Sequence, residues 1–307
     1  MADPTKYGGL GTGYASVTKP NPQTSKPFIS PEQWQHFNKF GYVHLGQVIP
    51  SELMAKLDKR ATALMMGDIR YDNLLMQLDP GGDYSTKVAT QTVGFKKQTL
   101  KYRKIGDAGA GLECDPIFCE AMTLPVFREA CAQIYGGHAD ISVYRAMLFN
   151  KPAHQGTNLP WHQDGGDWWG LDRDPLAFVW TAIDNATKEN GCVQVIPGSH
   201  KLGLLSRRGH TLSDESLQKL NPVQNGIHIE VASGESVLMH NFLVHGSGVN
   251  PTDQPRRAFS VNYCDARTRV LDPKPTVQPE NIVRPEERLK PGQQLPKIFD
   301  RLNSALF

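Results

Sequence analysis

The chain has 307 residues, of which 39% are hydrophobic and 21% are charged, a composition that favours a globular protein with a substantial core and argues against a disordered one. Its formal net charge of +2 argues against a nucleic-acid-binding protein and against a membrane-surface protein. No apolar run reaches the length of a transmembrane helix, and the polar N-terminus has no signal-peptide core. The five cysteines are irregularly spaced and odd in number, so we expect free thiols and a cytoplasmic protein.

The first third of the chain is predicted to be mainly helical. Residues 1–27 are rich in Gly, Pro, Thr and Lys, and we expect them to form a flexible arm. A helix is predicted to begin at Ser30-Pro31-Glu32-Gln33, where Ser30 and Gln33 can form a capping box, and to end at Gly41. A short strand is expected at 42–45, and further helices are expected to begin at Ser51, Asp115-Pro116 and Leu124-Pro125. Residues 71–104 carry no clear pattern, which is typical of a functional loop or of strands too short to recognise.

After residue 140 the pattern changes to short apolar segments separated by turn residues. Strands are predicted at 141–150, around His162, and at 178–184, 192–196, 228–231, 236–240 and 258–264. Short strands that follow a helical region predict a mainly β fold, with an antiparallel barrel or sandwich supported by N-terminal helices. We expect a single domain over residues 28–285 and a C-terminal extension over 286–307, with a short helix at 296–306.

A metal site is suggested by His162-Gln163-Asp164. Residues i and i+2 of an extended segment project from the same face, so His162 and Asp164 can bind one ion together. A nitrogen and oxygen pair of this kind suits Fe(II), Zn or Mn, although the same pair also occurs on ordinary protein surfaces. A second histidine is available at His240 or His245, and spacing does not choose between them. Arg256 precedes an apolar strand, and its planar guanidinium suits a dicarboxylate.

Over about residues 30 to 270 the chain resembles the phytanoyl-CoA dioxygenase family of Fe(II)/2-oxoglutarate-dependent oxygenases. The segments that carry the resemblance occur in the family's order. They are Met147-Leu-Phe-Asn-Lys-Pro152, Trp161-His-Gln-Asp164, Trp180-Thr-Ala-Ile-Asp184, Asn190-Gly-Cys-Val-Gln-Val-Ile-Pro-Gly-Ser-His200, His245-Gly-Ser-Gly248 and Arg256.

The resemblance implies a double-stranded β-helix, or jelly roll, of cupin-like type, which agrees with the predicted strands. It also implies an enzyme that uses Fe(II), O2 and the cosubstrate 2-oxoglutarate, which it decarboxylates to succinate and CO2. Hydroxylation, with desaturation or ring rearrangement as alternatives, is favoured over halogenation because Asp164 stands where halogenating relatives have a small residue. The residues to which it gives roles are His162, Asp164 and His245 as iron ligands, Arg256 and Ser247 at the far carboxylate of 2-oxoglutarate, Gln163, Trp180 and Met147 along the cosubstrate pocket, and Lys104 near the same carboxylate.

The substrate is less well indicated. Residues 165–174 differ from the corresponding part of relatives that hydroxylate CoA esters, so an acyl-CoA is not indicated. Adjacent Trp168 and Trp169 on a glycine-flanked loop predict an aromatic wall of the substrate pocket. Asp167 or Arg173 would select a polar or charged substrate if either reached the pocket. We therefore expect a partly apolar small molecule, such as a secondary metabolite or a lipid-like acid, and not a nucleic acid.

Two other functions fit the same residues. A cupin-like metalloenzyme could use Zn or Mn for isomerisation or hydrolysis, and it would have no need of Arg256. A non-catalytic small-molecule binder could use the same fold without producing succinate. Both ends of the chain could also contribute to a homo-oligomer interface.

Overall fold

The computed structural model of the chain describes residues 27–81, 91–137, 139–206, 211–271 and 290–299. The helices within these ranges are α1 (Pro31–Phe40), α2 (Ser51–Met66), α3 (Pro116–Met122), α4 (Pro125–Tyr135), α5 (Asp214–Leu220) and α6 (Pro222–Asn225). Within the same ranges, 3-10 turns form at Leu112–Cys114, Asp167–Trp169 and Ser199–Leu202. Among the described residues no helix combines the length and the apolar character needed to span a bilayer.

The described strands form two antiparallel sheets. The larger sheet has the order β1-β10-β7-β12-β5-β4-β2-β3, with β13 paired to β5. Its strands are β1 (Tyr42–Gly46), β2 (Leu75–Leu78), β3 (Gln91–Val93), β4 (Tyr102–Ile105), β5 (Ile141–Lys151), β7 (Ala177–Ala182), β10 (Ser236–His240), β12 (Arg256–Asp265) and β13 (Lys297–Phe299). The smaller sheet has the order β6-β11-β8-β9, with β6 (Leu159–His162), β8 (Val193–Val195), β9 (Ile227–Ile229) and β11 (His245–Ser247).

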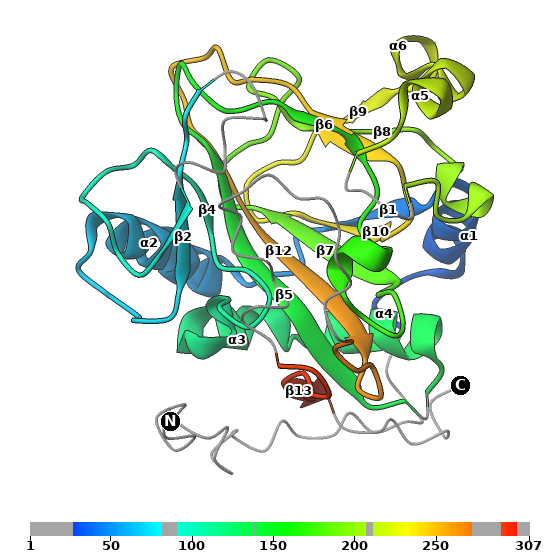
Figure 1. Cartoon of the computed structure of the whole chain (residues 1–307), viewed down its shortest axis with the longest axis horizontal. Helices are drawn as coiled ribbons and strands as arrows, with labels where there is room; N and C mark the ends of the chain where they lie inside the picture. Colours follow the sequence, from blue (N-terminus) through cyan, green and yellow to red (C-terminus); the bar gives the residue numbers. More distant parts are fainter. Residues whose placement is uncertain (1–26, 82–90, 138, 207–210, 272–289, 300–307) are drawn as a thin grey trace.

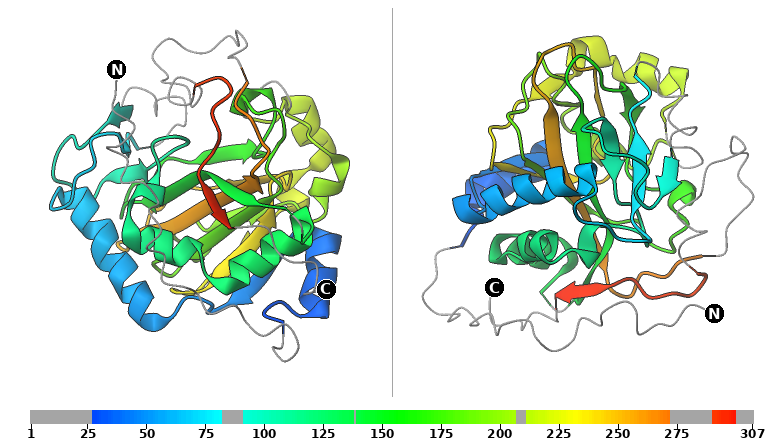
Figure 2. Two further views of the ribbon diagram at one scale, coloured as in Figure 1. Left: turned by 90° about the horizontal axis from the view of Figure 1, so that it is seen from below. Right: turned by 90° about the vertical axis from the view of Figure 1, so that its left-hand side faces the viewer.

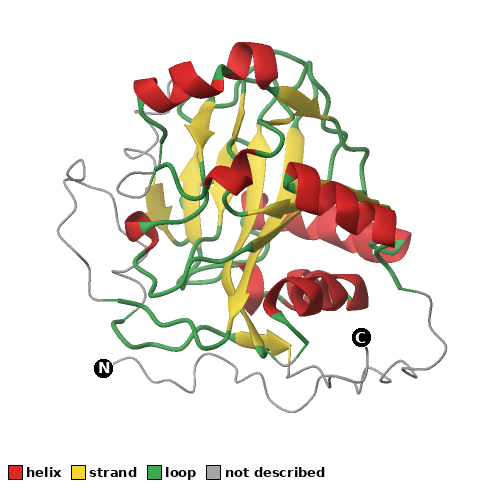
Figure 3. Ribbon diagram, turned by 90° about the vertical axis from the view of Figure 1, so that its right-hand side faces the viewer, coloured by secondary structure: helices red, strands yellow, loops and turns green. Residues whose placement is uncertain are grey.

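Helices and sheets are arranged in layers. Helices α2, α3 and α4 lie along one face of the larger sheet, and the smaller sheet lies on its other side (Figures 1 and 2). The helix-side core joins Leu57 and Phe118 to the strand residues Val143 and Phe259, and the Phe118 and Phe259 ring centroids are 4.8 Å apart. Helices α5 and α6 lie apart from the others, at the end of the molecule that contains β8 and β9 (Figures 1 and 3).

Strand alternation gives the two long central strands of the larger sheet two different faces. On β5, Ala146 and Leu148 belong to the helix-side core, whereas Met147 and Lys151 line a pocket on the opposite face. On β12, Phe259 belongs to the same core. Successive side chains of a strand point to opposite sides of the sheet, so each strand contributes both to the core and to the pocket.

Much of the predicted fold is confirmed. The chain is mainly β with antiparallel sheets and supporting helices, as a double-stranded β-helix requires. The capping box of α1 is present, because the Ser30 side chain accepts a hydrogen bond from the Gln33 backbone N–H and the Gln33 side chain accepts one from the Ser30 N–H. The unpatterned region 71–104 contains β2, β3 and β4, which the sequence did not reveal.

One terminal prediction is wrong, and another lies outside the described residues. The predicted helix at 296–306 is replaced at Lys297–Phe299 by β13, which pairs with the start of β5. Pairing with an available strand satisfies the backbone groups of this segment, so its own helical tendency does not decide its structure. The rest of that predicted helix, at 300–306, and the arm at 1–26 are not among the described residues.

Candidate active site

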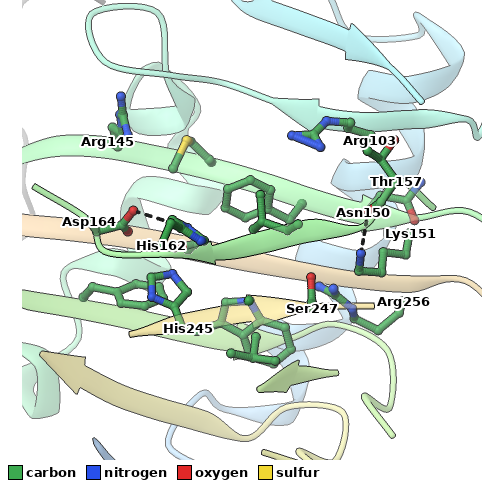
Figure 4. A pocket seen from close by; sticks show the side chains of 18 of the residues that line it. Arg103, Arg145, Asn150, Lys151, Thr157, His162, Asp164, His245, Ser247 and Arg256 are labelled. Carbon is green, nitrogen blue, oxygen red and sulfur yellow. Dashed lines mark hydrogen bonds and ion pairs between the residues drawn. The ribbon is translucent and has the colours of Figure 1, made fainter. Parts of the chain in front are cut away.

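Three metal-ligating side chains meet between β6 and β11. His162 ends β6, His245 begins β11, and the two residues are paired across the smaller sheet. Asp164 follows two residues after His162. One ligand atom from each residue lies within 4.8 Å of the others, and His162 Nε2 is 3.8 Å from Asp164 Oδ1 (Figure 4). Among the described residues this is the group that could hold a metal ion.

Hydrogen bonds orient both imidazoles toward this point. The Nδ1 of His162 is 2.8 Å from the Pro160 carbonyl oxygen, and the Nδ1 of His245 is 2.9 Å from the Leu243 carbonyl oxygen. A carbonyl only accepts, so each Nδ1 carries the proton and each Nε2 keeps its lone pair for a metal. Two such nitrogens and one carboxylate oxygen form the donor set of non-haem Fe(II) oxygenases, so these residues fit iron.

The structure resolves the choice between the two histidines that spacing left open. His240 lies outside the cluster; its Nδ1 accepts a hydrogen bond from the Phe242 N–H, and its ring centroid is 5.3 Å from that of His200. Burial, together with the nearby His200, lowers the pKa of His240 to about 4. His240 is therefore a neutral structural residue, and His245 completes the cluster with His162 and Asp164.

Two buried cations lie at the other end of the same pocket. Arg256, 4% exposed, donates through Nη2 to the Gly191 carbonyl oxygen at 3.0 Å, and its guanidinium carbon is 5.5 Å from the centroid of the Trp180 ring. Lys151, its partner in the β5–β12 register, donates to the Thr157 carbonyl oxygen at 2.8 Å. Burial lowers the pKa of Arg256 to about 10 and that of Lys151 well below its usual range.

This end of the pocket fits a carboxylate. Among the described residues the buried Arg256 Nε has no hydrogen-bond partner, and a buried donor left without a partner costs about 1–3 kcal/mol. Adjacent Arg256 and Lys151 also repel each other, which contributes to the lowered pKa of Lys151. A bound anionic group would relieve both effects.

Several predicted cosubstrate residues line this pocket, which has a volume of about 110 Å³. The predicted residues among its walls are Met147, Trp180, Ser247 and Arg256, together with His162, Asp164 and His245. Walls that the sequence analysis missed include Asp79, Arg103, Arg145, Phe149, Asn150, Lys151, Thr157 and Phe178. Strand alternation could have revealed part of this set, because Arg145, Met147, Phe149 and Lys151 are every second residue of β5.

Two of the predicted cosubstrate residues are not pocket walls. Gln163 is fully buried, and its amide donates to the Gly203 and Phe242 carbonyl oxygens and accepts from the Leu205 N–H. It lies between His162 and Asp164 in sequence, so strand alternation directs it away from the site that they form. Lys104 forms an ion pair with Asp107 at 2.7 Å; its neighbour Arg103 lines the pocket instead.

The predicted substrate loop is also corrected. Trp169 is 1% exposed and packs on Tyr144 in a small core cluster, so it is not a wall of the pocket. Asp167 and Arg173 are exposed and are not among the pocket walls. The side chain of Trp168 lies outside what the structure describes.

Comparison with known proteins agrees with this geometry. A model of the family "Phytanoyl-CoA dioxygenase (PhyH)" matches residues 37–258. A probable phytanoyl-CoA dioxygenase of Caenorhabditis elegans is 26% identical over 267 residues, which cover 83% of this chain and 80% of that protein. The peroxisomal phytanoyl-CoA dioxygenase of Homo sapiens is 31% identical over 157 residues, which cover 47% of this chain and 45% of the human protein.

Solved structures share the fold. EctD from S. alaskensis, crystallised with 2-oxoglutarate and 5-hydroxyectoine, superposes with a TM-score of 0.66 at 20% sequence identity. The superposition covers 91% of this chain and 89% of the EctD chain. The non-haem α-ketoglutarate-dependent carbocyclase SnoK from nogalamycin biosynthesis gives a TM-score of 0.63 at 21% sequence identity. That superposition covers 91% of this chain and 100% of the SnoK chain. The family model matches most of the length of this chain. The chain therefore belongs to the phytanoyl-CoA dioxygenase family of Fe(II)/2-oxoglutarate-dependent oxygenases.

Proposed function

We propose that this chain is an Fe(II)/2-oxoglutarate-dependent dioxygenase that hydroxylates an unactivated C–H bond of a partly apolar small molecule. One O2 and one 2-oxoglutarate would be consumed for each hydroxylated product, with release of succinate and CO2. The observation that carries the proposal is that one pocket contains both the His-Asp-His cluster and the buried pair Arg256 and Lys151.

Each residue has a distinct role in this proposal. His162, Asp164 and His245 would hold the iron, which when bound supplies the O2-dependent oxidation chemistry. The Asn262 side chain donates to Asp164 Oδ2 at 3.4 Å and so helps to orient the carboxylate. Both imidazoles are already held by backbone carbonyls, so the site needs little rearrangement to bind a metal.

The cationic end of the pocket would select the cosubstrate. Arg256, assisted by Ser247 and Lys151, would bind the far carboxylate of 2-oxoglutarate. The apolar walls Trp180 and Met147 would keep water away from the bound cosubstrate, which strengthens these charge interactions. A cupin-like Zn or Mn hydrolase or isomerase, or a binder without catalysis, would have no use for this buried cation pair.

An anaerobic titration tests the proposal. The protein with Fe(II) is expected to develop a weak visible metal-to-ligand charge-transfer band when 2-oxoglutarate is added, and to release succinate once O2 is admitted. The variant Asp164→Ala is expected to lose substrate hydroxylation, whereas the exposed control Asp214→Ala on α5 is expected to keep the band and the succinate release. Absence of the band in the wild-type protein, or undiminished hydroxylation by Asp164→Ala, would reject the proposal.

A further inference from the structure

One face of β5 extends along the pocket from the metal cluster to the cation pair. Arg145, Met147, Phe149 and Lys151 alternate along this strand and all line the pocket. Lys151 pairs with Arg256 of β12, whereas Arg145 pairs with Asn262. The two pairs are separated by ~20 Å of strand, at about 3.3 Å per residue. The dicarboxylate 2-oxoglutarate is much shorter than this separation, so one molecule does not reach from Lys151 to Arg145.

The metal cluster lies at the Arg145 end of the strand. Asn262, the register partner of Arg145, donates its side-chain hydrogen bond to the Asp164 carboxylate. Figure 4 shows Arg145 on the side of Asp164, while Arg256 and Lys151 lie on the opposite side of His162. If 2-oxoglutarate lies between the metal and Arg256, as the proposed function requires, Arg145 remains on the side of the metal that is left for the substrate.

Arg145 is held firmly in this position. Its Nε is 2.9 Å from Asp107 Oδ1, and its guanidinium carbon is 4.3 Å from the centroid of the Trp169 ring and 5.0 Å from that of Tyr144. Its side chain is 9% exposed. A guanidinium fixed by an ion pair and two aromatic rings loses little conformational freedom when it binds a ligand.

The carboxylate that holds Arg145 is shared with a second cation. Asp107 Oδ1 pairs with Arg145, and Asp107 Oδ2 pairs with Lys104 at 2.7 Å.

We propose that the substrate of this enzyme is a small carboxylic acid whose carboxylate is bound by Arg145 beside the metal cluster. A planar guanidinium matches a carboxylate through two parallel charge-assisted bonds. At this end of the pocket the apolar wall is Phe178, which pairs with Asn262 and whose ring centroid is 5.6 Å from that of His245, and it suits an alkyl or aromatic skeleton. This inference rests on the proposed function and adds to it the chemical class of the substrate.

Matched pairs of simple ligands test the inference even while the natural substrate is unidentified. The probes are octanoate, decanoate and 3-phenylpropanoate, each compared with its primary amide, which keeps the shape and loses the charge. They are added anaerobically to the enzyme with Fe(II) and 2-oxoglutarate, and the change in the charge-transfer band is measured. We expect at least one acid to bind with a Kd of about 1 mM or tighter and its amide to bind roughly 10-fold or more weakly, the loss of a charge-assisted bond.

Variants assign the preference to Arg145. In Arg145→Gln the ratio of amide to acid Kd is expected to fall below about threefold, since the charge-assisted bond is lost. The Kd of 2-oxoglutarate should stay within about twofold, because Arg256 and Lys151 are intact. Arg145→Lys, which keeps the charge without the planar fork, should retain part of the preference. The exposed control Arg267→Gln, whose side chain is 72% exposed, should keep all of it.

The possible failures are distinguishable. The inference is overturned if no acid binds, if amides bind as well as acids, if Arg145→Gln keeps the full preference, or if its 2-oxoglutarate Kd rises in parallel. The last result would assign Arg145 to the cosubstrate. Should Arg145→Gln not fold, the comparison of acid with amide in the wild-type enzyme still decides whether the substrate site selects an anion. A wild-type enzyme that forms no charge-transfer band before any acid is added fails the proposed function itself.

Discussion

Replacing Arg256 by lysine tests the cosubstrate end of the pocket. Arg256 presents a planar fork whose Nη2 is bound to the Gly191 carbonyl oxygen and whose buried Nε has no partner in the part of the chain that the structure describes. Lysine keeps the positive charge but cannot make two parallel bonds to a carboxylate. The loss of one charge-assisted hydrogen bond costs about 1.5–3 kcal/mol, so the Kd of 2-oxoglutarate should rise roughly 10- to 150-fold.

The adjacent Arg257 provides a matched control. Strand alternation turns it away from the pocket, and its Nη2 forms ion pairs with Asp58 at 2.8 Å and with Asp184 at 2.6 Å. Arg257→Lys should lower the free energy of unfolding while leaving the 2-oxoglutarate Kd unchanged. The assay is an anaerobic titration followed at the charge-transfer band. An unchanged Kd in Arg256→Lys, or an equal rise in both variants, would refute the assignment of the carboxylate to Arg256.

Three further predictions concern the metal cluster and the core. His245→Ala should abolish the charge-transfer band, whereas His240→Ala should retain it. A retained band in His245→Ala would show that His245 is not the second histidine ligand of the metal. The Tyr135 hydroxyl donates to the Tyr263 carbonyl oxygen at 2.6 Å and accepts from two backbone N–H groups. Tyr135→Phe should therefore lower the free energy of unfolding, measured by chemical denaturation, by about 2–4 kcal/mol. An unchanged free energy of unfolding would contradict this. Glu113 is partly exposed as a residue, but its Oε2 is buried and has no partner among the described residues, and burial raises its pKa from an ordinary 4.5 to about 7. The native state therefore binds the proton more tightly, and stability should fall by about 3 kcal/mol as pH rises from about 5 to about 8. Glu113→Gln should remove this decrease, and an unchanged pH dependence would argue against it.

Local sequence signals predicted the elements whose structure is decided locally. The capping box of α1 depends on residues only three apart, and the alternating strands after residue 140 carry their own pattern. The pair His162 and Asp164 followed from the same alternation. The family motif predicts Gln163 in the cosubstrate pocket, but the same alternation directs it away from the two ligands, and its amide donates to the Gly203 and Phe242 carbonyl oxygens.

Features that depend on pairing between distant strands could not be predicted. Lys151 lies beside Arg256 only because β5 pairs with β12 in one register, and no local pattern specifies that register. Trp169 likewise turns inward because Tyr144 and Arg145, on a strand remote in sequence, offer it a surface to pack against. β2, β3 and β4 are short, and their pairing with one another and with β5 stabilises them more than their own composition does.

The same register links stability to substrate choice. A shift of β5 by one residue would exchange its two faces and move Arg145 and Lys151 into the helix-side core, where Ala146 and Leu148 are now fully buried. Burying an unpaired cation there would cost several kcal/mol, and exposing the apolar residues would cost about 1.5–3 kcal/mol for each large side chain. The hydrophobic contacts of β5 with the helices therefore fix the positions of the two cationic ends of the pocket. Variants that enlarge or shrink the helix-side core at Leu148 should consequently change substrate and cosubstrate affinity together with stability, although this side chain is not a wall of the pocket.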